Sequence, residues 1–215
     1  MTVRPRVFGL ALVALLFVTP KSHASTILLA NLTNSQEPGN IIPTLSPANG
    51  GGLRPVSFGT AMFVLNDAAT AMTFTATIFN IDVTGTQTPD TFDNLTAAHI
   101  HAGPNIAPAT NSVVWGFFGA PFNDNNPNDF TMTPFATGVG GTFSGKWDLP
   151  EGNGVNVNLQ NQLPFILNGQ AYINFHTVQF GGGEIRGVLL TPEPGTWFLV
   201  GGGLALLLRR RLTKR

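Results

Sequence analysis

One alternating segment constrains the fold of this 215-residue chain more than any other feature. Within residues 69–80, apolar and threonine side chains alternate: Met72, Phe74, Ala76 and Ile78 against Thr73, Thr75 and Thr77. Successive side chains of a β-strand point to opposite faces of a sheet, so this period of two predicts a half-buried strand. No long stretch of residues 25–191 shows helical periodicity, which favours an all-β domain.

Clusters of Gly, Pro, Asn and Asp separate further strand-like segments. We expect strands over residues 25–33, 59–66, 69–80, 97–102, 112–118, 141–149, 170–177 and 184–190. Residues 155–167 are ambiguous, with a short helix before Asn168-Gly169 as one interpretation. Strands at this spacing predict a single all-β domain, either an antiparallel sandwich or a barrel.

The N-terminal residues predict export. Arg4 and Arg6 precede an apolar run over residues 7–18, which is too short for a stable membrane span. Small residues follow, so residues 1–24 are interpreted as a signal peptide that signal peptidase cleaves between Ala24 and Ser25.

The C-terminal residues have the composition of a sorting signal. Pro192-Glu193-Pro194 precedes an apolar segment over residues 197–208 and then the basic run Arg209-Arg210-Arg211. As a helix the apolar segment would be about 18 Å long, well short of a bilayer core of about 30 Å. Residues 192–215 therefore resemble the PEP-CTERM signal of Gram-negative bacteria. That resemblance implies a sorting helix, processing by exosortase, and transient attachment to the inner membrane before delivery to the cell surface or extracellular matrix.

The remaining domain, residues 25–191, is acidic and lacks cysteine. Its 3 basic and 10 acidic side chains give a net charge of −7, which disfavours nucleic acid and anionic lipid as partners. Without disulfides the exported domain must be stabilised by its core alone, for which it is long enough.

The histidines of this domain, His99, His101 and His176, all fall in predicted strands. Residues two apart share a face of a strand, so His99 and His101 point the same way. The same rule places polar side chains on one face of the predicted strands 170–177 and 184–190. These side chains are Tyr172, Asn174, His176, Glu184 and Arg186. If these strands are neighbours, three imidazoles gather on one face, and neutral imidazole is a common ligand of copper and zinc.

Two interpretations of this cluster remain open. In the first, His99, His101 and His176 bind Cu or Zn, and Glu184 lies beside the ligands without binding the ion. The ring nitrogens must then lie within about 5 Å of one another, and affinity should fall as the pH drops through about 6.5. In the second, the cluster is purely structural, and Glu184 pairs with Arg186 or with a histidine.

The same residues carry a resemblance to a known family. The matching motifs are Leu32-Thr33 with Gln36-Glu37-Pro38, Gly59-Thr60-Ala61, Thr96-Ala-Ala-His-Ile-His-Ala-Gly-Pro104, Gly169-Gln-Ala-Tyr-Ile-Asn-Phe-His-Thr177 and Gly182-Gly-Glu-Ile-Arg-Gly187. Together they resemble the CHRD domain over about residues 27–190. The family has no generally established activity, so the resemblance implies architecture more than function.

Two functions of different classes follow. The first is a non-catalytic module of the cell envelope or extracellular matrix that binds an exopolysaccharide or a surface protein. Aromatic side chains such as Trp115, Trp147 and Tyr172 would stack on sugars if exposed, although core packing is the other role open to the tryptophans. The second is a Cu- or Zn-binding domain, with redox activity as an option. No Ser/His/Asp arrangement is visible, and we assign no enzyme activity.

Overall fold

The computed structural model describes residues 25–39, 41, 53–125, 127–148, 151 and 158–192. The predicted signal peptide and the sorting segment beyond Pro192 lie outside the described residues. The strands are β1 (Thr26–Thr33), β2 (Phe58–Leu65), β3 (Met72–Phe79), β4 (Leu95–Ala102), β5 (Val113–Phe118), β6 (Thr131–Pro134), β7 (Gly140–Trp147), β8 (Ala171–Thr177) and β9 (Ile185–Val188). The helices are a 3-10 turn, η1 (Asn34–Gln36), and α1 (Leu159–Leu167).

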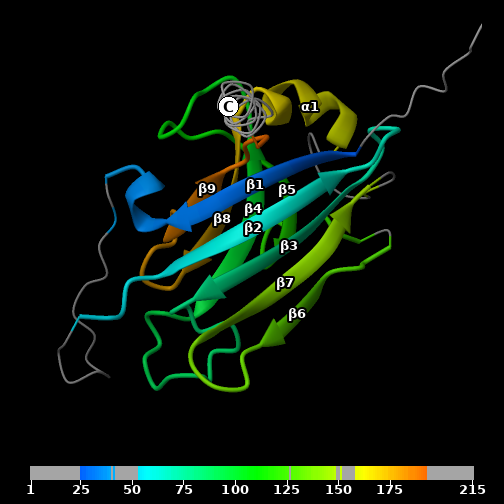
Figure 1. The fold of residues 1–215 in the computed structure, drawn as a ribbon. Coiled ribbons are helices and arrows are strands. Elements are labelled where there is room, and N and C mark those ends of the chain that lie inside the picture. The colour runs from blue at the N-terminus through cyan, green and yellow to red at the C-terminus, as the bar shows by residue number, and fades with distance from the viewer. Residues whose placement is uncertain are drawn as a thin grey trace, which may run out of the picture.

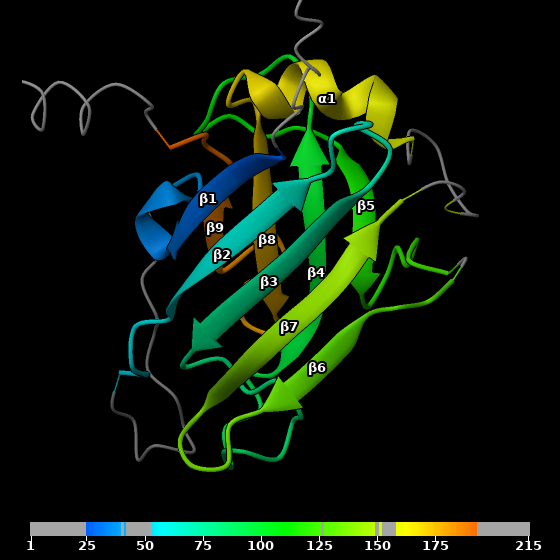
Figure 2. The same cartoon turned by 45° about the vertical axis from the view of Figure 1, so that its right-hand side comes forward.

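All nine strands belong to one antiparallel sheet in the order β5-β4-β8-β9-β1-β2-β3-β7-β6. Figures 1 and 2 show that the sheet curls, so that β2, β3 and β7 lie across from β8 and β4. The prediction of a single antiparallel all-β domain is confirmed. Between the two architectures that the sequence left open, the chain adopts a single curled sheet, a half-barrel.

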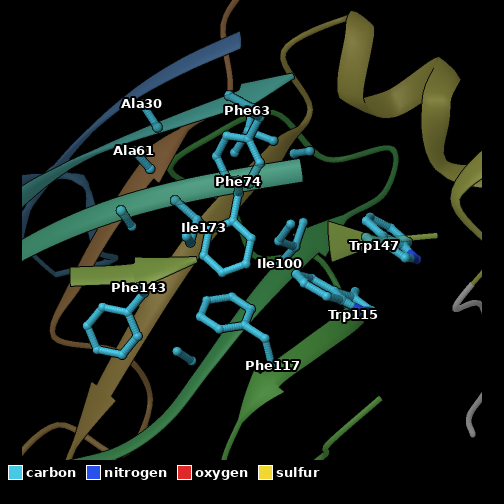
Figure 3. Packing of buried hydrophobic residues seen from close by; sticks show 14 of the residues in the cluster. Ala30, Ala61, Phe63, Phe74, Ile100, Trp115, Phe117, Phe143, Trp147 and Ile173 are labelled. Carbon is cyan, nitrogen blue, oxygen red and sulfur yellow. The ribbon is translucent and has the colours of Figure 1, made fainter. Parts of the chain in front are cut away.

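The curl is stabilised by one aromatic core shared by strands that are distant in the sheet order. Phe74 of β3 packs on Phe117 of β5 with ring centroids 4.6 Å apart, and Phe143 of β7 packs on Phe175 of β8 at 5.2 Å. Figure 3 shows the rings of Phe74, Phe117 and Phe143 between the strands. Fully burying each of these side chains contributes about 1.5–3 kcal/mol, which favours the curled sheet over a flat one.

The aromatic side chains that the sequence offered for sugar stacking are all buried. Trp115 and Trp147 are fully buried and stack on each other with ring centroids 5.8 Å apart, and Tyr172 is only 2% exposed. The tryptophans therefore have the core-packing role, and none of the three presents a face to a saccharide.

The ambiguous segment before Asn168-Gly169 does contain a helix. Asn158 caps α1 by accepting a hydrogen bond from the Gln160 backbone N–H, and Gly169 follows its end with a φ of 71°. Figures 1 and 2 show α1 across one end of the sheet. No helix among the described residues is long and apolar enough to cross a bilayer.

Candidate metal centre

The three histidines lie on two neighbouring strands near one edge of the sheet. β4 pairs with β8, and the register sets His99 opposite Asn174, His101 opposite Tyr172, and Ala97 opposite His176. Directly opposed residues of antiparallel strands share a face, so the three imidazoles lie on one side of the sheet. The strand adjacency on which the sequence hypothesis depended is confirmed.

The ring nitrogens converge. One candidate ligand atom from each of His99, His101 and His176 lies within 4.8 Å of the others. The closest pair is His99 Nδ1 and His176 Nε2, at 3.2 Å. The geometric condition set from the sequence, a separation of about 5 Å or less, is therefore met.

Each ring also directs its second nitrogen at a backbone carbonyl. His99 Nε2 lies 3.0 Å from Ala120 O, His101 Nδ1 lies 2.9 Å from Asn111 O, and His176 Nδ1 lies 3.1 Å from Gly181 O. A carbonyl oxygen can only accept, so each of these nitrogens must donate its proton.

The proton assignment leaves lone pairs facing inward. A neutral imidazole carries one N–H, so His99 Nδ1, His101 Nε2 and His176 Nε2 are all unprotonated acceptors. His101 Nε2 is buried and has no hydrogen-bond partner. The 3.2 Å contact between His99 and His176 then joins two lone pairs, an arrangement that a shared cation would stabilise.

The surroundings keep all three rings neutral. Burial, together with the neighbouring His176 and His101 rings, lowers the pKa of His99 to about 4. Burial likewise lowers the pKa of His101 to about 4, although the hydrogen bond to Asn111 opposes the shift. The pKa of His176 is also lowered, chiefly by burial. Neutral imidazole is the form that can act as a metal ligand, so at neutral pH the three rings have the protonation state that a metal site requires.

A stack of side chains backs the site. The Tyr172 ring lies parallel to that of His101, with centroids 4.7 Å apart, and the Arg186 guanidinium lies over the Tyr172 ring, 4.1 Å from its centroid. Arg186 in turn forms a buried ion pair with Glu37, with Nη2 2.7 Å from Oε2. The charges stacked behind the site are thus an arginine and the carboxylate that balances it.

Glu184 lies in a different buried cluster. Its carboxylate accepts hydrogen bonds from Arg54 Nη2 at 2.9 Å, Ser57 Oγ at 2.6 Å and Thr177 Oγ1 at 2.6 Å. Its ion pair is with Arg54. The pairing with Arg186 that the sequence suggested is therefore wrong, because Arg186 binds Glu37 instead.

Sequence reasoning missed the groups that orient the histidines. The acceptors are main-chain carbonyls of Asn111, Ala120 and Gly181, which lie in loops after β4, β5 and β8. A backbone carbonyl is present at every residue, so no residue type could have identified them. The sequence did point to Glu37, because this residue belongs to one of the motifs that carry the family resemblance.

The comparison with known proteins identifies the architecture. The sequence model of one protein family, described as the CHRD domain, matches residues 28–189, which extend from β1 to the end of β9. No curated protein and no solved structure matches the chain.

Proposed function

This chain belongs to the CHRD domain family, and from that premise we propose that it is an exported, non-catalytic β-module that binds a copper or zinc ion through His99, His101 and His176. One observation carries the proposal: three buried ring nitrogens converge with their lone pairs facing one another. A purely structural cluster would place a donor against each acceptor, because an unpaired buried acceptor costs about 1–3 kcal/mol.

The distances support a shared ion. Two nitrogens that each lie about 2.0–2.1 Å from a tetrahedral metal are about 3.3 Å apart, and His99 Nδ1 and His176 Nε2 are 3.2 Å apart. The three nitrogens lie within 4.8 Å of one another, so the longest separation would shorten by up to about 1.5 Å on binding. The hydrogen bonds to carbonyls would hold the rings in the required orientation.

Calorimetric titration of the metal-free protein with Zn(II) and Cu(II) tests this function. We expect one equivalent to bind, and we expect His101→Ala to abolish binding because it removes one of three ligands. Thr75→Val is the control, since Thr75 is an exposed residue of β3, a strand that does not pair with β4 or β8, and the variant should bind as the wild type does. Binding to the wild type weaker than about 100 μM for Zn(II), for Cu(II) and, under anaerobic conditions, for Cu(I) would refute the metal function.

We also propose that the module is delivered to the cell surface or extracellular matrix. The resemblance of residues 1–24 to a signal peptide and of residues 192–215 to a PEP-CTERM signal supports this. Signal peptidase and exosortase are then its partners during export, and an exopolysaccharide or surface protein is its partner afterwards.

Cell fractionation tests the delivery. N-terminal sequencing of surface protein should find Ser25 first, and retention of Met1 would contradict export. Glu193→Ala should leave the protein in the inner membrane, as should deletion of residues 209–211, because one removes the recognition triplet and the other the basic stop. Normal release of both variants would show that residues 192–215 do not sort the protein.

A further inference from the structure

We infer that the histidine site selects a monovalent ion, Cu(I), over the divalent ions Zn(II) and Cu(II). The inference rests on the proposed metal function and specifies the ion. It follows from the charge of the ligands, the charge of their surroundings and the number of ligands.

The ligand set is neutral and buried. His99, His101 and His176 are 4%, 9% and 8% exposed, and among the described residues they are the only histidine, aspartate or glutamate side chains that gather into a possible metal cluster. The cost of moving an ion from water into a low-dielectric site grows with the square of its charge, so a divalent ion is penalised about four times as heavily as a monovalent one. No ligand charge offsets that penalty here.

The surroundings add no negative charge at the ligands. All three outward N–H groups donate to backbone carbonyls, whereas a carboxylate in that position would raise the basicity of the ligand and partly neutralise a divalent ion. The charged group stacked behind the site is the cationic Arg186, which lies on Tyr172 and is balanced by Glu37. The Glu184 carboxylate is bound to Arg54 in a separate cluster.

The ligand number favours the same ion. Zn(II) takes four ligands in a tetrahedron, so at this cluster of three histidines it would need a water or an anion as the fourth. Cu(I) has a filled d shell and is stable with three nitrogen ligands in a plane. The three histidines can therefore complete its coordination without an anion or water.

Competition titrations under anaerobic conditions test the inference. Metal-free protein competes with bicinchoninate for Cu(I) and with 4-(2-pyridylazo)resorcinol for Zn(II). We expect the dissociation constant for Cu(I) to be at least about 100-fold smaller than that for Zn(II). An equal or tighter affinity for Zn(II) would overturn the selectivity and leave the metal function standing, whereas failure to bind either ion would remove both.

An added carboxylate provides a matched variant. Asn174 is 1% exposed, lies directly opposite His99 in the register, and has an Oδ1 atom without a hydrogen-bond partner. Asn174→Asp places a negative charge beside an unchanged ligand set, so the ratio of Cu(I) to Zn(II) affinity should fall about 10-fold. The same change at Asn66, in the exposed turn between β2 and β3, should leave the ratio unaltered. A ratio that Asn174→Asp does not move would show that charge does not set the selectivity.

Discussion

The curled sheet has two halves that follow the same alternation but differ on their outer faces. In the open half (β1, β2, β3, β7 and β6), the outward Thr73, Thr75 and Thr77 of β3 are wholly or partly exposed. In the covered half (β5, β4, β8 and β9), every residue of β8 is buried, whichever face it occupies. Inward-facing residues are apolar in both halves, so the difference lies in what covers the outer face.

Loops cover the outer face of the covered half. Asn111, Ala120 and Gly181 contribute carbonyls to the histidines, and Glu37, just after η1, binds Arg186 of β9. Once these loops exclude water, each polar side chain beneath them needs a partner within the protein. The two halves therefore differ because loops bury the polar face of one of them, and the candidate metal site lies on that buried polar face.

The largest expected difference between the halves concerns ion pairs. Arg186→Ala should lower the free energy of unfolding by about 3–5 kcal/mol, because it leaves the buried Glu37 without its partner. Lys146→Ala in the open half removes a partly exposed pair with Asp129 and Asp148 and should cost no more than about 1 kcal/mol. Urea denaturation of both variants measures the difference, and equal losses would mean that covering the outer face has no energetic consequence.

The stability of the metal-free protein should depend on pH through the buried histidines of the covered half. The folded-state pKa of His101 is lowered to about 4, so between about pH 6.5 and 4 the unfolded chain binds more protons at this residue. Lowering the pH through that window therefore reduces the free energy of unfolding of the wild type. The contribution of His101 to this loss is up to about 1.4 kcal/mol per pH unit. His101→Gln lacks the contribution, so the stability difference between wild type and variant should shrink as the pH falls.

Other titratable groups stabilise the folded protein as the pH falls, so the effect of His101 is visible only as a difference between wild type and variant. Burial raises the pKa of Asp124 to about 6 and that of Glu151 to about 7, so folding takes up protons there as the pH falls. Both carboxylates are present in wild type and variant and cancel in the comparison. A stability difference that is constant from pH 7 to 4 would contradict the lowered pKa of His101.

Metal affinity should fall at a lower pH than the value of about 6.5 that the sequence suggests. With the pKa of His99 and His101 near 4, protons do not compete for these ligands at pH 6.5. We expect Zn(II) affinity to stay level from pH 7 to about 5 and to decline only near pH 4, as measured by chelator competition at each pH. A decline centred near 6.5, the value of an exposed histidine, would show that the site opens to water in solution.

The smallest contrast uses one substitution in both halves. Thr177 Oγ1 donates to Glu184 and accepts from the Phe180 N–H in the covered half, so Thr177→Val should cost about 1–3 kcal/mol. Thr75 occupies an exposed position of β3, and Thr75→Val should change stability by no more than about 0.5 kcal/mol. Chemical denaturation measures the loss of unfolding free energy in each variant. Equal losses would contradict the prediction.

Much of the fold follows from local sequence patterns. The alternation within residues 69–80 predicts β3 and its two faces, and the turn signal at Asn168-Gly169 predicts the end of α1. By contrast, no pattern predicts β6 (Thr131–Pro134), because four residues ending in proline are too few to show a period of two. It pairs only with β7, at the edge of the sheet.

The sequence by itself determined which side chains share a face, because the two-residue period of a strand is a local property of the backbone. That period alone places His99 with His101, and His176 with Asn174 and Tyr172. Only the tertiary structure decided that β4 lies in register beside β8, which carbonyls accept the histidine protons, and that Arg186 binds Glu37 while Glu184 binds Arg54. These contacts join residues far apart in the chain, and they depend on how loops close over one face of the sheet, which no local pattern encodes.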